Sequence, residues 1–393
     1  MRHIFVRTVR YEDDPFCGLC EYVSLHGAGE VIRLDLDDDD FARVWKVEYS
    51  IRKHFRVLYY RRIFASLCRR LMAVTSAHDP CVVYFSDEGV WTELWCDVRR
   101  QIVNPQLRAI NVQHGFATLE AIKTRRIRHV MNVLSRGVFG YPNFGLGSAG
   151  GSGRFAFDAY LTYDAATARL VTGRTGAIAL ATPYLIKSDA LSRAASTVVY
   201  PHRVEGPVVF ALQPRIRGGL IKGDLQATFD QLEPLARALK QLRKTMVLRL
   251  HPGMSREVTL RIYRNHSICG VAVLDEVPDI YQSITASEAV MSFYSTVLWE
   301  AYLLGLVAIQ VKSPVCNSAV LHYPHHELDL SRTFFDQLVR IMEHCARPRA
   351  LMVHAQQQHE WHALRDLYGR WYGFDCVAPA PSAAFTIASD TGP

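Results

Sequence analysis

The sequence lacks the patterns that mark membrane-spanning and secreted proteins. No uninterrupted apolar run reaches the ~18 residues that a spanning helix needs. The first residues, MRHIFVRTVRYEDD, have charges that break their short apolar stretch, unlike the hydrophobic region of a secretory signal. We therefore expect a cytoplasmic protein, and peripheral association with the inner membrane surface is left open.

Common nucleotide and metal fingerprints are also missing. The glycine-rich stretch at 140–154 lacks the strand-to-helix context of a P-loop or dinucleotide motif, and we interpret it as a mobile loop near a cleft. Cys17 and Cys20 have CxxC spacing, but no second CxxC or CxxH pair follows to complete a zinc site. The nine cysteines are odd in number, which disfavours a disulfide framework and favours reduced thiols in the core.

The bulk composition is that of a folded, slightly basic protein. A chain of 393 residues that is 49% hydrophobic is long enough for two domains with separate cores. The net charge of +7 suits an anionic ligand, a membrane surface or nucleic acid, and an arginine-rich proteome explains it equally well. Because no Lys/Arg stripe with aromatic platforms is evident, we expect no nucleic acid partner.

Apolar runs alternate with helical patterns along the chain. Strands are expected at 1–9, 30–34, 80–85, 107–112, 157–162, 176–181, 208–212, 246–250, 271–274, 289–291 and 307–311. Helices are expected at 41–74, 90–103, 225–244, 297–304, 334–345 and 351–372, with a polar loop after the first strand. This order predicts two doubly wound α/β domains, at 1–200 and 207–350, followed by a C-terminal helix that crosses back and a tail at 351–393.

Two strands of the first half are followed by chemically active side chains. Asp87, Glu88 and Gly89 follow the strand at 80–85, and Gln113, His114 and Gly115 follow the strand at 107–112. Neighbouring parallel strands bring such ends together, so the acids and His114 are expected to share one crevice. Asp87 or Glu88 is then a general base or a helix N-cap, and His114 is a second base, an acceptor contact or a buried structural histidine.

The second half repeats the arrangement with groups that suit phosphate. His251 and Pro252 end the strand at 246–250, Ser292 ends the apolar run at 289–291, and Ser295 and Thr296 lie where a helix begins. A helix N-terminus with free N–H groups and hydroxyls binds anions. His251 is alternatively a turn residue, and Ser295 is alternatively only an N-cap.

Three further residues complete the candidate donor site. Arg215 and Lys222 lie in the loop after the strand at 208–212, where they either contact a sugar carboxylate or phosphate or are simply solvated. Glu300 lies one turn into the helix at 297–304, at the edge of the predicted core or at a ligand.

The order and rough spacing of these motifs resemble those of bacterial sialyltransferases of the GT-B fold, which carry D/E-D/E-G, HP and Ser/Thr motifs. The resemblance rests on Asp87-Glu88-Gly89, on His251-Pro252, and on Ser292 with Ser295-Thr296. It implies two Rossmann-like domains facing a central cleft, and inverting transfer of an acidic sugar from a CMP-sugar donor to a glycan or glycolipid acceptor in surface polysaccharide or lipooligosaccharide synthesis.

The resemblance also implies residue roles. Asp87 or Glu88 would deprotonate the acceptor hydroxyl, His251 and the hydroxyls of Ser295 and Thr296 would hold the CMP phosphate, and Glu300 would bind ribose. Helix dipole and side chains can stabilise a leaving group without metal, so we expect no essential metal and no cofactor besides the donor.

Some features depart from the sialyltransferase pattern. Gln113-His114-Gly115 is similar to a motif of Kdo transferases of capsule and lipopolysaccharide synthesis, and the HP and Ser-Thr features also resemble CDP-glycerol glycerophosphotransferases. A Kdo, glycerophosphate or UDP-sugar transferase of the same fold is therefore an alternative. A non-catalytic protein that binds an anionic ligand or nucleic acid is the alternative from another class.

Overall fold

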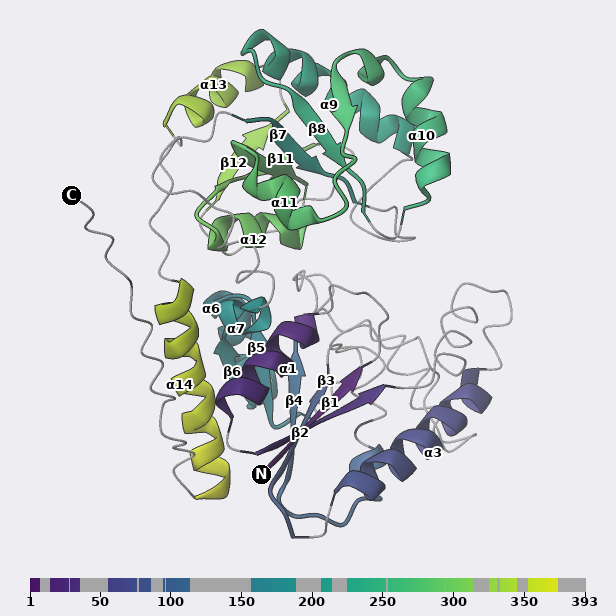
Figure 1. The fold of residues 1–393 in the computed structure, drawn as a ribbon, viewed down its shortest axis with the longest axis vertical. Helices are drawn as coiled ribbons and strands as arrows, with labels where there is room; N and C mark the ends of the chain where they lie inside the picture. The colour runs from purple at the N-terminus through teal and green to yellow at the C-terminus, as the bar shows by residue number, and fades with distance from the viewer. Residues whose placement is uncertain are drawn as a thin grey trace, which may run out of the picture.

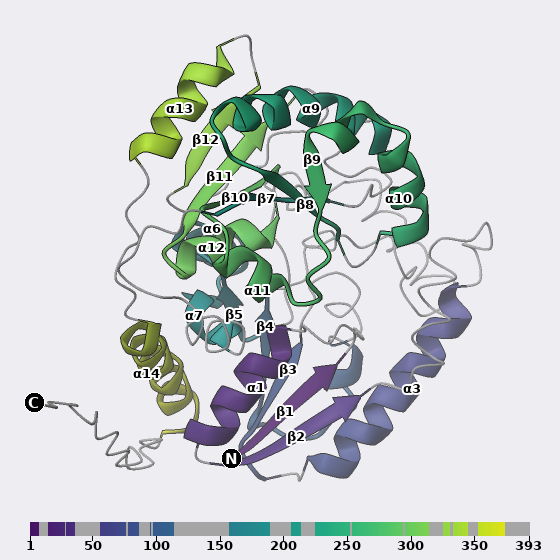
Figure 2. The same ribbon diagram turned by 45° about the horizontal axis from the view of Figure 1, so that its top comes forward.

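Two parallel sheets organise the chain, one in each half. The computed structural model describes residues 1–7, 15–27, 29–35, 56–75, 78–85, 95, 97–113, 157–188, 206–213, 225–251, 254–293, 295–313, 325–330, 333–344 and 353–373. Each sheet has six strands and is flanked by helices (Figures 1 and 2). The predicted fold class, an α/β protein with two Rossmann-like sheets, is confirmed.

The first sheet has the strand order β2-β1-β3-β4-β5-β6. Its strands are β1 (Arg2–Arg7), β2 (Glu30–Asp35), β3 (Cys81–Phe85), β4 (Leu107–Val112), β5 (Ala159–Thr162) and β6 (Ile178–Ala181). The order reverses between β1 and β3, which pair with each other in parallel. Ligand crevices of open α/β sheets lie beyond the carboxyl ends of the strands at such a switch point.

The second sheet has the order β12-β11-β10-β7-β8-β9. Its strands are β7 (Val208–Ala211), β8 (Met246–Arg249), β9 (Ala272–Leu274), β10 (Ala289–Ser292), β11 (Val307–Lys312) and β12 (His326–Asp329). The switch point lies between β7 and β10. Strand β12 was not predicted from the sequence, because it is an edge strand in which Leu328 alone is buried.

Helices connect and cover the strands. In the first half they are α1 (Pro15–His26), α3 (Arg56–Val74), α6 (Ala165–Thr175) and α7 (Pro183–Ile186). The second half contains α9 (Leu225–Gln241), α10 (Arg256–Arg264), α11 (Ile280–Thr285), α12 (Thr296–Leu303) and α13 (Phe334–His344), and α14 (Val353–Tyr372) follows. None of the described helices is long and apolar enough to cross a membrane.

The prediction of a polar loop between the first two strands is wrong, because helix α1 begins at Pro15. Leu19, Tyr22 and Val23 recur at helical spacing and are buried against the first sheet. Cys20 of the CxxC pair is buried in this helix, and its Sγ accepts a hydrogen bond from Nε of Arg33 at 3.2 Å. The expected helix at 41–74 is described only from Arg56 onward, and the glycine-rich stretch at 140–154 lies outside the described residues.

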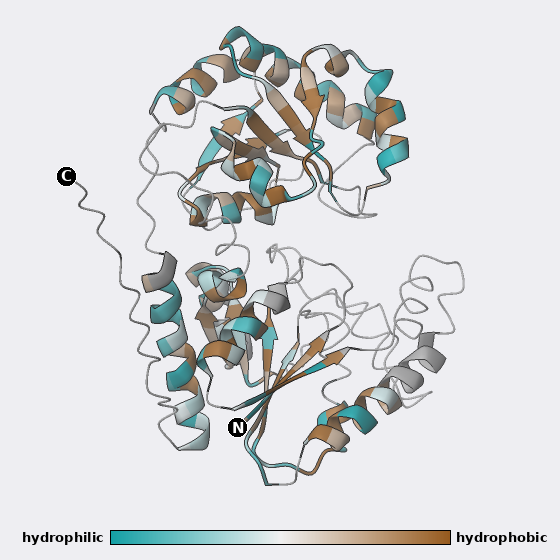
Figure 3. Ribbon diagram, viewed as in Figure 1, coloured by the Kyte–Doolittle hydropathy of each residue, from teal (hydrophilic) through white to brown (hydrophobic). Residues whose placement is uncertain are grey.

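Apolar strands form the interior of both halves, and the hydrophilic residues gather on the outer helices (Figure 3). One buried cluster contains Val82 and Tyr163 of the first half together with Val209 and Leu298 of the second, so an apolar core is shared across the junction. The arrows of β1 and β2 point toward the second half (Figures 1 and 2), and the arrow of β9 points toward the first (Figure 2). Because each sheet is parallel, the two carboxyl edges face each other.

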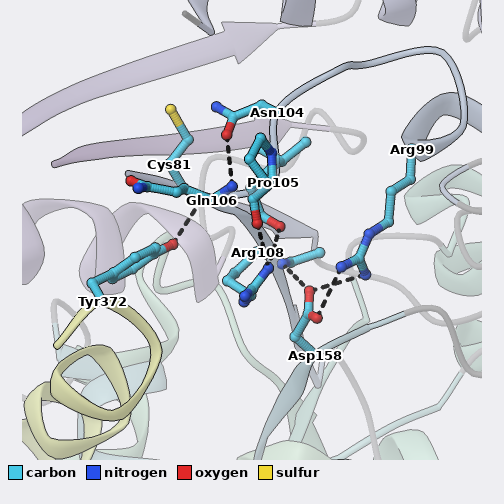
Figure 4. Close-up of polar contacts among 10 residues, drawn as sticks. Cys81, Arg99, Asn104, Pro105, Gln106, Arg108, Asp158 and Tyr372 are labelled. Carbon is cyan, nitrogen blue, oxygen red and sulfur yellow. Dashed lines mark hydrogen bonds and ion pairs between the residues drawn. The ribbon is translucent and has the colours of Figure 1, made fainter. Parts of the chain in front are cut away.

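Helix α14 packs on the first half, on the side of the sheet away from α3 (Figures 1 and 2). Its Tyr368 hydroxyl bonds to the Tyr84 hydroxyl, which also bonds to Nδ1 of His3 at 2.9 Å. The Tyr372 hydroxyl donates to the carbonyl of Cys81 at 2.9 Å (Figure 4). The last described helix is thus hydrogen-bonded twice to β3, and His3 of the adjacent β1 joins this network through Tyr84.

Asp158 anchors the amino edge of the first sheet. It receives two hydrogen bonds of 3.2 Å from the guanidinium of Arg99 and one of 2.8 Å from the N–H of Ala109 (Figure 4). Bidentate arginine pairs are geometrically specific as well as strong. The entry to β5 is therefore held beside β4.

Glu360 of α14 makes a testable contribution to stability. It is 6% exposed and accepts the N–H of Leu185 in α7 at 2.8 Å. Burial raises the pKa of its carboxyl from 4.5 to about 8, against the opposing effect of the backbone N–H groups of Leu185 and Tyr184. Because the folded pKa is raised, this group stabilises the fold fully only below about pH 4, and the contribution is lost as pH rises through 8.

Glu360→Gln keeps an oxygen acceptor for Leu185 and removes the buried charge. We expect the variant to melt about 3 °C or more above the wild type at pH 9, with a smaller difference at pH 6. Thermal melting curves recorded between pH 6 and pH 9 measure this difference in melting temperature. Glu343→Gln, at an exposed position of α13, is the control. Parallel melting curves for wild type and Glu360→Gln at every pH would contradict the assignment.

Candidate functional site

The carboxyl ends of β7, β8 and β10 form the candidate donor site in the second half. His251 lies just beyond β8 and is partly exposed, and its carbonyl accepts the N–H of Met254 at 2.9 Å. Ser295 lies just beyond β10. Since β7 pairs with both strands, His251 and Ser295 flank the switch point from opposite sides.

Ser292 holds this switch point together. It is fully buried, and its Oγ donates to the carbonyl of Ala211 across the β10–β7 pair at 2.7 Å. The side chain of Gln310 donates in turn to the carbonyl of Phe293 at 2.9 Å. The Ser292 hydroxyl therefore already donates its proton within the sheet, and it could donate to a phosphate oxygen only by giving up that bond.

Ser295 and Thr296 begin helix α12 as the sequence pattern indicates. Ser295 is the N-cap, and its Oγ accepts the N–H of Val297 at 3.3 Å. The helix ends at Leu303 with Leu304 as its C-cap, and Gly305 follows at φ 73°, where the N–H groups of Gly305 and Leu306 bond back to the carbonyls of Tyr302 and Ala301. The positive end of the helix dipole thus lies at the carboxyl edge of the sheet.

Glu300 is not solvent-facing. Its side chain is 4% exposed, and Oε1 lies 2.6 Å from Nζ of Lys187, which follows α7 in the first half. Glu300 was predicted from the sequence as a site residue, but Lys187 was not. No local pattern indicates a pair so far apart in the chain.

Arg249 holds the loop that follows β9, and we call its set of contacts the arginine clamp. Nη1 of Arg249, the last residue of β8, lies 3.1 Å from the Asp275 carboxylate, and Nη2 donates to the carbonyl of Pro278 at 2.7 Å. Ser283 of α11 also donates to Asp275. The loop after β9 is therefore tied both to β8 and to α11.

A cavity of about 640 Å³ opens beside this clamp, between α10, the β8–β9 edge and α11. This volume is within the usual range of small-molecule pockets. Its lining includes Val247, Leu250, Arg256, Arg264, Val273 and Gln282. The sequence analysis did not single out this lining, because it comes from separate segments.

In the first half, the structure describes only some of the residues predicted to form the acceptor side of the site. Gln113 is 4% exposed, and its Oε1 accepts the N–H of Tyr163 at 2.9 Å, so this side chain joins the ends of β4 and β5. The remaining predicted residues lie outside the described ones and keep their roles as predictions: Asp87, Glu88, His114, Arg215, Lys222 and Pro252.

No group of three or more His, Cys, Asp or Glu side chains suited to a metal ion occurs among the residues that the structure describes. The acidic residues Asp87 and Glu88 lie outside that set. The expectation of a metal-independent site is therefore tested only by activity.

The sequence matches no protein-family model and no curated protein. By structure, the chain is similar to the UDP-GlcNAc 2-epimerase from Neisseria meningitidis bound to UDP-GlcNAc, with a TM-score of 0.55, 13% identity, and coverage of 94% of this chain and 100% of the other. The chain is also similar to the S. aureus MnaA structure with UDP. The TM-score is 0.55, the identity is 12%, and the match covers 97% of this chain and 99% of the other.

The UDP-N-acetylglucosamine 2-epimerase from Rickettsia bellii is similar at a TM-score of 0.54 and 9% identity, covering 94% and 97% of the two chains. Identities this low establish the architecture alone. The chain has the GT-B fold over nearly its whole length.

Proposed function

We propose that the protein is an inverting glycosyltransferase that uses a nucleotide-sugar donor, held by the second half, and a glycan or glycolipid acceptor, held by the first. The observation that carries the proposal is the position of the motifs. β3 borders one switch point and is followed in the sequence by Asp87 and Glu88, and His251, Ser295 and Thr296 follow strands beside the other switch point. Ligand crevices open at such points, and the carboxyl edges of the two sheets face each other.

The donor half supplies what a nucleotide phosphate needs. His251, the Ser295 hydroxyl and the N-terminus of α12 lie along one edge of the second sheet, and groups of these kinds stabilise the negative charge that grows on a departing phosphate. The acid pair opposite supplies the base that inverting transfer requires. Arg215 and Lys222 are proposed to contact the phosphate or a sugar carboxylate.

For the donor we propose a CMP-linked acidic sugar, on the strength of the motif likeness to sialyltransferases. A UDP-sugar is the second candidate, because structurally similar proteins were solved with UDP and with UDP-GlcNAc. Calorimetric titration with CMP, UMP and UDP separates them. Tighter binding of CMP supports the first, tighter binding of a uridine nucleotide supports the second, and binding of none would contradict a nucleotide-sugar enzyme.

Transfer itself is tested with the donor that binds. Incubation with CMP-sialic acid or a UDP-sugar and a panel of glycans should release the nucleotide and extend the glycan. A changed sugar stereochemistry in the nucleotide-bound donor, without transfer, would instead indicate an epimerase.

We further propose that no divalent metal is needed. In excess chelator, the initial rate of transfer should stay within about twofold of the untreated enzyme, because helix dipole and side chains supply the electrostatic stabilisation. Loss of activity that a single divalent ion restores would overturn this point.

A further inference from the structure

Lys187 and Glu300 bring one charge from each half into the junction. Nζ of Lys187 lies 2.6 Å from Oε1 of Glu300, and the two side chains are only 10% and 4% exposed. Lys187 directly follows α7, the last described element before β7. Glu300 belongs to α12, the helix whose N-terminus faces the proposed phosphate position.

The surroundings of Lys187 keep its amine charged. Burial acts to lower the pKa of Lys187, but Glu300, Tyr163 and Tyr281 act to raise it, and the pKa lies well above its usual range. Nζ also lies 6.0 Å from the centroid of the Tyr163 ring, within reach of a cation–π contact. The junction therefore holds a permanent cation against the only acid of α12.

The position of Glu300 on α12 creates an electrostatic problem for an anionic ligand. Glu300 comes four residues after Thr296, the first residue of the helix, which is about 6 Å along the axis. A buried carboxylate so close to the helix N-terminus opposes the dipole that attracts phosphate. Buried charges interact over such distances with little screening.

We propose that Lys187 is a positioning residue for the donor: it compensates the charge of Glu300 beneath the N-terminus of α12, and so allows that helix to accept a nucleotide phosphate. This inference rests on the proposed function. The compensating charge comes from the first half, so phosphate affinity in the second half depends on the junction between them.

Helix α7 is well placed to hold this cation. Its N–H at Leu185 donates to Glu360 of α14, while Lys187 at its other end meets Glu300 of α12. A short element of the first half is thus fixed by two later helices. A purely structural role for Lys187 would affect all ligands of the site alike, whereas charge compensation affects anionic ligands selectively.

The test compares a nucleotide with its nucleoside. The nucleotide is whichever of CMP, UMP or UDP binds the wild type. Calorimetry measures the affinity of each protein for this nucleotide and for the matching nucleoside. The proteins compared are the wild type, Lys187→Met, Lys187→Arg and the double variant Lys187→Met/Glu300→Gln. We expect Lys187→Met to lose about tenfold or more in nucleotide affinity and about twofold or less in nucleoside affinity. Lys187→Arg should retain most of the nucleotide affinity, and the double variant should recover part of it.

Lys244→Met is the matched control. Lys244 and Glu288 form another, partly buried ion pair, but they lie at the amino edge of the second sheet, just before β8 and β10. This variant should keep the nucleotide-to-nucleoside ratio of the wild type, whatever its melting temperature. Melting curves of all variants show that the proteins compared are folded.

Two failures are distinguishable. A wild type that binds no nucleotide would refute the proposed function, and this role of Lys187 with it. A wild type that binds nucleotide, with Lys187→Met losing nucleotide and nucleoside affinity equally or losing neither, would overturn the inference alone. If Lys187→Met does not fold, failure of Lys187→Arg to retain the nucleotide preference overturns it.

Discussion

Replacing the catalytic base is expected to lower the rate of glycosyl transfer by about 10²–10⁴-fold, the usual contribution of general base catalysis. Asp87→Asn and Glu88→Gln test the two carboxylates that follow β3. Both substitutions preserve shape and remove the ability to accept the acceptor proton. Nucleotide affinity should be unchanged within about twofold, because the proposed donor site is built from the opposite half.

The measurement pairs initial rates with calorimetric nucleotide affinity for each variant. Asp79→Asn is the control, because Asp79 lies before the same strand at its amino end and is exposed. Full turnover in both acid variants would move the base to His114, and His114→Ala should then show the loss. A variant that loses nucleotide affinity as well as turnover would place its carboxylate at the donor.

His251→Ala is expected to weaken nucleotide affinity by about 10-fold to 100-fold, which corresponds to losing a hydrogen bond to a charged group. His251 lies at the end of β8 beside the switch point, where an imidazole N–H can donate to a phosphate oxygen. A loss confined to the rate would mean that the imidazole acts only on the departing phosphate.

Calorimetry of the variant with the nucleotide, together with the rate at saturating donor, separates these two outcomes. His78→Ala is the control, since His78 is exposed near the amino edge of the first sheet. Wild-type affinity and wild-type rate in His251→Ala would show that His251 only shapes the turn before Pro252. That result would remove the HP motif from the donor site.

The two halves of the proposed site depend on each other through the junction. Lys187 and Glu300 form a buried ion pair there, and an apolar core continues from the first half into the second. Breaking one partner of a buried pair leaves an uncompensated charge, which is more damaging than losing the pair altogether. Donor binding and the relative orientation of the halves are therefore expected to change together.

The sequence alone was sufficient for the order of most strands and for the fold class. Runs such as 81–85 and 208–211 are apolar throughout, because strands of a sheet covered on both faces bury nearly every side chain. The residues that flank α12, Ser295 at its N-cap and Gly305 after its C-terminus, could also be predicted from the sequence, since caps depend on local backbone geometry. Helix α1 and strand β12 were missed because their local signals are weak and packing decides them.

Only the tertiary structure decided which side chains have partners. The sequence indicates Glu300 and Ser292 as candidate donor-site residues, but their partners Lys187 and Ala211 belong to other segments, which only the fold brings near them. Periodicity and capping act over a few residues, so a sequence displays them directly. Ion pairs across a junction and the strand order that creates a switch point join distant segments, and they exist only once the chain has folded.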